Sequence, residues 1–139
     1  MKHNEPVSHI MSNELLTVHA AQKVSEVYTL LTENRIHHVP VVNGEKPIGL
    51  ISSSDMMKLS LDAYGTPDSA NAEYLDSQFT IEQVMSSDLV TIGADEPIRT
   101  AVEKLSTGTL HSLPVVGEDG MLVGIVTTTD LVKYLLDQY

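Results

Sequence analysis

The sequence has no cysteine or tryptophan, and it has only 8 Lys and Arg against 19 Asp and Glu in 139 residues. Without cysteine, disulfide scaffolds and thiolate zinc sites are excluded. The net charge of −11 would repel a phosphate backbone, so we expect no nucleic-acid partner. No apolar run approaches the ~20 residues that a membrane-spanning helix requires, and the N-terminus lacks the apolar segment of a secretory signal. We therefore expect a soluble, cytoplasmic protein without a membrane partner.

The chain contains an internal repeat. A shift of 74 residues superposes Met, Thr, His and Pro-Val-Val positions in order, and Gly and Asp follow after one inserted residue. The coinciding pairs are Met11 and Met85, Thr17 and Thr91, His37 and His111, Pro40 and Pro114, Gly49 and Gly124, and Asp55 and Asp130. Chance does not produce such an ordered series at a near-constant offset, so we interpret the chain as a duplicated unit.

Each copy predicts the same first two elements. A short apolar and β-branched run predicts a strand at residues 15–18, and again at 89–92. Apolar residues at spacings of three and four then predict a helix over residues 24–31, and another over 98–105. Pro97 fits a first-turn position of the second helix.

A hairpin follows in each copy. Residues 39–42 and 48–51 are strand-like runs separated by an Asn-Gly pair at 43–44, and the second copy has Asp-Gly at 119–120. These dipeptides supply the positive backbone angles of a tight turn, so each pair of runs predicts an antiparallel hairpin.

The last element of each copy begins with a hydroxyl cap. Ser52 with Asp55, and Thr127 with Asp130, have the spacing of a cap and an acid three residues on, which predicts a helix start. Four methionines occupy apolar positions where this residue usually fills core gaps. They are Met11, Met56, Met57 and Met85.

The order strand, helix, strand, strand, helix therefore occurs twice, which predicts an α/β (α+β) fold of two tandem β-α-β-β-α repeats. We assign residues 1–62 to repeat 1, 63–79 to a connector and 80–139 to repeat 2. One such repeat has too little core to stand alone. We expect the two to pack sheet against sheet about a pseudo-twofold axis as one compact unit, with a cleft between them.

The order of motifs resembles the cystathionine-β-synthase (CBS) domain, here as a tandem pair covering nearly the whole chain. The resemblance rests on a Met-containing start, a Leu-x-Thr-Val strand, a His-x-x-Pro-Val-Val strand, and Gly-h-h-[Ser/Thr]-x-x-Asp opening a helix. It implies a sensing module without chemistry of its own, which binds an adenine nucleotide in its central cleft and forms a homodimer.

Ligand-contacting residues are predicted at matching positions of the two copies. First-turn aspartates can accept hydrogen bonds from the two vicinal hydroxyls of a ribose, and hydroxyls beside a helix N-terminus suit a phosphate. The resemblance adds the Thr-Val or Thr-Ile strand for the base and the residue before the Val-Pro or Leu-Pro step for the phosphate. The predicted residues are Thr17, Val18, His38, Val39, Pro40, Ser52, Ser54, Asp55, Thr91, Ile92, Ser112, Leu113, Pro114, Thr127, Thr129 and Asp130.

A purely structural interpretation of the same residues stays open. Capping alone explains an acid and a hydroxyl at a helix start, and the two roles can coexist. Thr17 and Thr91 also suit an ordinary strand. If the hydroxyls only cap helices, the chain would be a ligand-free dimerisation module whose apolar helix faces bind a partner.

Histidine raises the question of a metal site. The adjacent His37 and His38 point to opposite faces of a strand, so they cannot readily share one ion, and we expect no metal. His38 instead holds the phosphate-facing position implied by the resemblance, where Ser112 stands in the second copy. Protonation of His38 would then raise phosphate affinity as the pH falls.

No catalytic apparatus is evident. The sequence has no glycine-rich phosphate loop and no serine in a nucleophile-elbow context. We therefore predict a non-enzymatic regulatory module with no obligatory cofactor, which binds AMP, ADP or ATP and modulates an unknown partner protein in trans. A minor hydrolase or metal-dependent enzyme is the remaining alternative.

Overall fold

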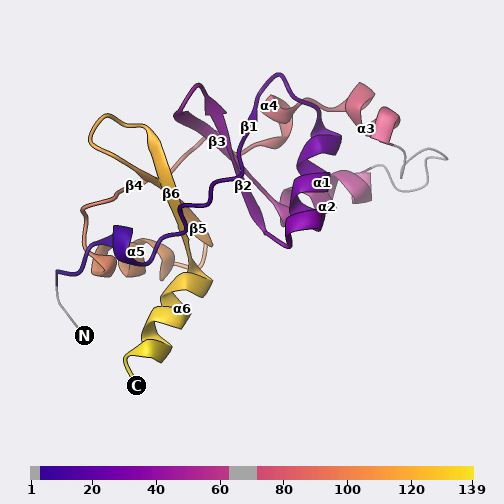
Figure 1. The fold of residues 1–139 in the computed structure, drawn as a ribbon. Helices are drawn as coiled ribbons and strands as arrows, with labels where there is room; N and C mark the ends of the chain where they lie inside the picture. The colour runs from indigo at the N-terminus through magenta and orange to yellow at the C-terminus, as the bar shows by residue number, and fades with distance from the viewer. Residues whose placement is uncertain (1–3, 63–71) are drawn as a thin grey trace. The chain divides into compact units, whose positions relative to one another are not determined.

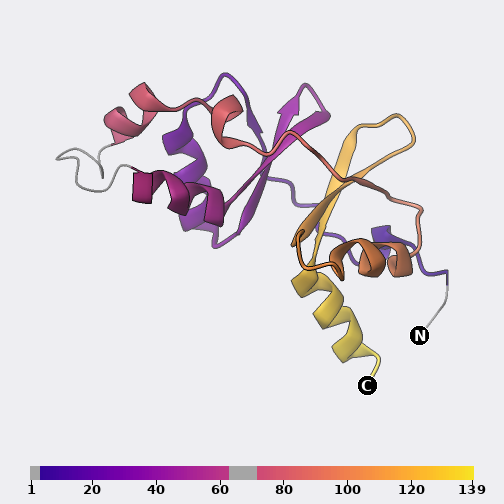
Figure 2. The ribbon, with the colours of Figure 1, turned by 180° about the vertical axis from the view of Figure 1, so that it is seen from behind.

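The computed structural model describes residues 4–62 and 72–139, with the side chains of 4–59 and 72–139. Residues 63–71 of the predicted connector lie outside this part. The chain divides into two compact units, one formed by Leu16–Leu89 and the other by the N-terminal residues up to Leu15 together with Val90–Tyr139. Figure 1 labels their helices and strands, and Figure 2 shows them from behind.

The unit Leu16–Leu89 contains a three-stranded sheet in the order β1-β2-β3. β1 runs parallel to β2, and β2 and β3 form an antiparallel hairpin. Its elements are β1 (Val18–His19), α1 (Val24–Asn34), β2 (His38–Asn43), β3 (Lys46–Ser52), α2 (Ser53–Asp62), α3 (Ala72–Gln78) and α4 (Ile81–Val84).

The other unit repeats this plan with the sheet β4-β5-β6. Its elements are the 3₁₀ turn η1 (Val7–His9), β4 (Ile92–Gly93), α5 (Ile98–Leu105), β5 (Ser112–Val116), β6 (Leu122–Thr127) and α6 (Thr128–Asp137). The predicted mixed α+β class and the twofold β-α-β-β-α order are therefore confirmed.

The first strand of each repeat is shorter and later than predicted. Residues 15–17 and 89–91 are not in strands, because the parallel ladder holds only two residue pairs, starting at Val18 with Val41 and at Ile92 with Val115. In the first repeat the chain then turns at once toward α1, with the Gln22 amide donating to the His19 carbonyl (3.0 Å).

Two turn details also differ from the sequence interpretation. Asn43 pairs with Lys46, so the first hairpin turns at residues 44–45 and only Gly44 has a positive φ, of 65°. Pro97 precedes α5 as its N-cap residue with ψ of 150°, rather than lying in the first turn. It is held there by a bridge to Pro6, and the next amide, of Ile98, donates to the Glu5 carbonyl.

Each sheet is covered by the apolar face of its first helix. α1 buries Val24, Val27 and Leu31, and α5 buries residues 98, 101 and 105. Tyr28 and Val102, which the same spacing assigned to these faces, are 56% and 44% exposed. Met56 is buried, but Met57 is 66% exposed, so its predicted core position is wrong. The two residues are neighbours on a helix, and only one of them can face the sheet.

The first segment of each predicted repeat packs with the other repeat. Ser12 forms an antiparallel bridge with Ile125 of β6, and Ser86 forms one with Leu50 of β3. The sequence repeats and the compact units are therefore different divisions of the chain. Within the described residues, no helix is long and apolar enough to cross a membrane.

The range predicted as a connector contains helix α3, which the sequence interpretation missed. α3 packs on α1. Asp76 of α3 accepts hydrogen bonds from the Ser25 amide (2.9 Å) and the Ser25 hydroxyl (2.7 Å). A side chain 51 positions away in the sequence thus satisfies a free amide of the first turn of α1.

Candidate functional site

The strongest candidate site residues are the aspartates at the starts of α2 and α6. In the first repeat the Ser52 amide donates to Asp55 Oδ2 (2.8 Å), and the Asp55 amide donates to Ser52 Oγ (3.1 Å). In the second repeat Thr127 and Asp130 form the same reciprocal pair at 2.8 and 3.1 Å. Both predicted capping boxes are therefore present, with matching geometry.

Capping uses only one oxygen of each carboxylate. Among the described residues, none donates a hydrogen bond to Oδ1 of Asp55 or of Asp130. Both side chains are half-buried. Each aspartate is consequently fixed in position by its cap while it presents one free acceptor oxygen.

Hydroxyl groups surround both helix starts. Ser54 and Thr129 are exposed one residue before each aspartate, in the first turn of α2 and of α6. Thr128 donates from Oγ1 to the His111 carbonyl (3.3 Å), and the Ser53 amide donates to the His37 carbonyl (2.9 Å). These bonds anchor each helix start to the beginning of the neighbouring strand.

The strand register brings two further predicted residues to the same ends. His38 lies opposite Ser52 in the β2-β3 ladder, and Ser112 lies opposite Thr127 in the β5-β6 ladder. His38 is half-buried. Ser112 is only 3% exposed, and its Oγ has no hydrogen-bond partner among the described residues. Each repeat thus gathers a cap residue, an aspartate and the residue before the Val-Pro or Leu-Pro step.

The remaining predicted residues have a more structural setting. The side chains of Val18, Val39, Ile92 and Leu113 are buried in the two cores, and Pro40 and Pro114 are buried beside them. Thr17 and Thr91 are half-buried just before the first strands. The two threonines therefore have more accessible surface than the core residues that follow them.

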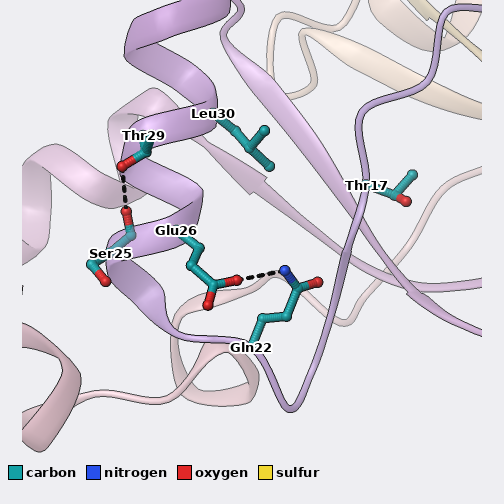
Figure 3. Close-up of a pocket in the computed structure, with 6 residues that line it drawn as sticks. All are labelled: Thr17, Gln22, Ser25, Glu26, Thr29 and Leu30. Carbon is teal, nitrogen blue, oxygen red and sulfur yellow. Dashed lines mark hydrogen bonds between the residues drawn. The ribbon is translucent and has the colours of Figure 1, made fainter.

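A cavity of about 390 Å³ lies in the first repeat, where the sequence interpretation predicted nothing except Thr17. Figure 3 shows that α1 forms one wall and the segment around Thr17 the other, with the Thr17 side chain turned away from α1. Its lining residues are Thr17, Gln22, Ser25, Glu26, Thr29 and Leu30. The signal in the sequence is that Leu30 stands where the second repeat has Lys104.

The structure also shows which kinds of ligand the helix starts suit. Among residues 4–62 and 72–139, no three His, Cys, Asp or Glu side chains come together in a group that could hold a metal ion. The arrangement at each helix start offers hydrogen-bond acceptors, hydroxyls and the positive end of a helix dipole. This chemistry suits binding of a polyhydroxylated, anionic molecule.

Comparisons with known proteins agree with the repeat. The CBS domain family model matches residues 7–62 and again 81–137. A homoserine O-acetyltransferase from Methanohalobium evestigatum is 29% identical over 131 residues, which cover 93% of this chain and 24% of that protein. The chain spans less than half of the length of several curated relatives that it matches.

The solved structures that this fold resembles include CBS domain pairs. The pair of protein MJ0100, in complex with 5′-methylthioadenosine and S-adenosyl-L-methionine, is 27% identical with a TM-score of 0.78, and the match covers 94% of this chain and 98% of that one. CBSX2 in complex with AMP is 21% identical with a TM-score of 0.79, covering 96% and 98%. This chain belongs to the CBS domain family, with two CBS domains in tandem.

Proposed function

We propose that the chain is a non-enzymatic regulatory module that binds an adenosine nucleotide, AMP, ADP or ATP, and modulates a partner protein in response. The observation that carries the proposal is the matched pair Asp55 and Asp130, each with one oxygen in a cap and one oxygen free. A ribose offers two adjacent hydroxyl donors, which a fixed carboxylate oxygen can accept.

The residues around each aspartate suit the other parts of a nucleotide. Ser54 and Thr129 present exposed hydroxyls at helix N-termini, where the helix dipole favours a phosphate without a Lys or Arg. His38 adds an imidazole in the first repeat, and the unpartnered hydroxyl of Ser112 adds a donor in the second. Thr17 and Thr91 would border the base.

The comparison with the MJ0100 pair supports an adenosine-type ligand. Both molecules bound to that protein are adenosine derivatives. A nucleotide would regulate this chain by binding one arrangement of it more tightly than another, because a ligand shifts a conformational equilibrium only by its differential affinity. The regulated protein would bind in trans or be part of the same polypeptide, as the greater length of several relatives allows.

Calorimetry and thermal unfolding with AMP, ADP, ATP and S-adenosylmethionine test the proposal. A ligand at 100 times its Kd should stabilise the chain by about 2.7 kcal/mol. Asp130→Asn keeps a capping oxygen but replaces the free acceptor by an amide donor, so it should weaken binding about tenfold with little loss of stability.

Asp137→Asn is the matched control, since it removes the same charge from the far end of α6. It should leave nucleotide affinity unchanged. Absence of binding by all four ligands, or equal weakening by the two substitutions, would overturn the proposal.

A second candidate function, dimerisation, is favoured by the exposed face of α6. Val132, Leu136 and Tyr139 are 60%, 71% and 95% exposed, and Leu135 is 44% exposed. Val132, Leu135 and Leu136 are spaced by three and four along α6 and so form one stripe, and Tyr139 follows the end of the helix. We propose that this stripe packs against a second copy of the chain, which sedimentation velocity tests. Leu136→Glu should shift a dimer to monomer, whereas Met57→Glu, at an exposed position of α2, is the control.

A further inference from the structure

A lysine side chain of the second repeat holds the position that corresponds to the cavity beside α1. There the ammonium Nζ of Lys104 donates a hydrogen bond to the Thr91 carbonyl oxygen, at 2.9 Å and in a partly buried setting. The offset of 74 residues that relates the repeats places Lys104 on Leu30 and Thr91 on Thr17. The first repeat therefore has Leu30 in place of the lysine, and Leu30 and Thr17 both line the cavity of about 390 Å³.

No described residue takes the place of Lys104 at the Thr17 carbonyl. Among the described residues none donates to it, and the Val41 amide of the adjacent strand lies in the antiparallel pairing with Gly49. Leu30 borders the cavity and has no polar atom in its side chain. A partly enclosed carbonyl with an open acceptor site gains most from a charged N–H donor.

A carboxylate borders the same cavity. Glu26 Oε2 accepts a hydrogen bond from Gln22 Nε2 (2.5 Å), and Gln22 Oε1 in turn accepts one from the His19 amide (2.7 Å). Figure 3 shows the Gln22 and Glu26 side chains pointing toward each other between α1 and the Thr17 segment. This chain of bonds orients Glu26, and no described residue donates to its other oxygen, Oε1.

We propose that this cavity binds the protonated amino group of a small aliphatic primary amine. The ammonium would donate to the Thr17 carbonyl and to Glu26 Oε1, as Lys104 donates to Thr91 in the second repeat, and the methylene chain would lie along Leu30. A quaternary ammonium ion has no N–H donor and cannot make these bonds. The net charge of −11 favours the approach of any cation, so the selectivity must come from the N–H donors.

Titration of the full chain with n-butylammonium by NMR tests the proposal directly. The amide signals of residues 17–30 should shift in a saturable manner, whereas n-butanol and tetramethylammonium should leave them unchanged. Glu26→Gln should weaken n-butylammonium binding about tenfold, the effect of losing one charge-assisted hydrogen bond. Glu33→Gln removes the same charge from the exposed end of the same helix and should retain the affinity.

Leu30→Lys supplies the missing ammonium from the chain itself. It should abolish n-butylammonium binding and raise the unfolding temperature. Amine binding that persists in Leu30→Lys, that Glu26→Gln and Glu33→Gln weaken equally, or that tetramethylammonium reproduces would overturn the proposal. Asp130→Asn should leave amine binding intact, so failure of the nucleotide proposal is a separate result.

Discussion

The carbonyl oxygen of Ser12 lies 2.9 Å from the position that a β-carbon would take on Gly124. The same carbonyl accepts the Ile125 amide (3.0 Å), and the Ser12 amide donates to the Ile125 carbonyl (2.9 Å), so the backbone there is fixed. Gly49 has the equivalent position against Met85 in the other unit. Because these glycines have no side chain, the first segment of each repeat can lie directly on a strand of the other repeat.

Gly124→Ala should therefore destabilise the chain by about 2 kcal/mol, because a fixed carbonyl cannot move away from the added methyl group. Gly49→Ala should cost less, since only the flexible side chain of Met85 lies close to it, whereas Gly124 faces the Ser12 carbonyl as well as the Met11 side chain. Urea denaturation measures both. Gly93→Ala is the control, because its nearest neighbour lies at 3.4 Å, an ordinary contact distance. Equal stability of the Gly93 and Gly124 variants would contradict this account of the packing.

Asp76→Ala should destabilise the chain by about 1 to 2 kcal/mol, because it leaves the Ser25 amide at the start of α1 without its partner. Ser25→Ala keeps the bond to the amide and loses only the bond from the hydroxyl, so it should cost less. Chemical denaturation of the two variants gives the comparison. Asp88→Ala removes an exposed carboxylate elsewhere and should have little effect. A larger loss in Ser25→Ala than in Asp76→Ala would refute the capping role.

Ser112→Ala should leave the stability of the ligand-free chain unchanged or raise it by about 1 kcal/mol. The hydroxyl of Ser112 is buried without a partner, and removing an unsatisfied polar group relieves its desolvation cost. If the hydroxyl serves the nucleotide, the same variant should bind AMP more weakly. Thermal unfolding with and without AMP separates the effects, and a marked loss of stability without ligand would show that Ser112 has a structural partner.

Affinity for a phosphate-bearing nucleotide should rise as the pH falls from about 8 to about 6, because an imidazole gains a positive charge over this range. The expected origin is His38, which lies opposite the cap residue Ser52. His38→Gln should remove the pH dependence, and adenosine, which lacks a phosphate, should show none. His111→Gln is the control, since His111 is exposed and lies one position earlier in the second repeat. Calorimetry at both pH values measures the affinity, and a pH dependence that persists in His38→Gln would contradict this origin.

Much of the local structure could be predicted from residue patterns. The duplication, the helix starts at Ser52 and Thr127, and the buried faces of α1 and α5 follow from spacing alone, because caps and amphipathic faces involve residues three or four positions apart. The first strands were predicted too early, since a run of β-branched residues does not show how many of them find a partner in a ladder.

The candidate site was predictable to a similar extent. The sequence indicated the aspartates and hydroxyls, but the free Oδ1 oxygens, the unpartnered Ser112 hydroxyl and the cavity beside Glu26 depend on distances in three dimensions. The free oxygens and the Ser112 hydroxyl have no signature in the spacing of residues, and the only sign of the cavity is that Leu30 stands where the second repeat has Lys104.

The sequence by itself determined the family, the order of elements and the chemical identity of the matched residues, because each of these is encoded in short-range patterns and in their repetition. Only the tertiary structure decided that the first segment of each repeat belongs to the compact unit of the other repeat. The same holds for Asp76, which caps α1 at Ser25, 51 positions away in the sequence. Long-range pairing depends on shape complementarity, such as a glycine opposite a carbonyl, which becomes apparent only when the chain is folded.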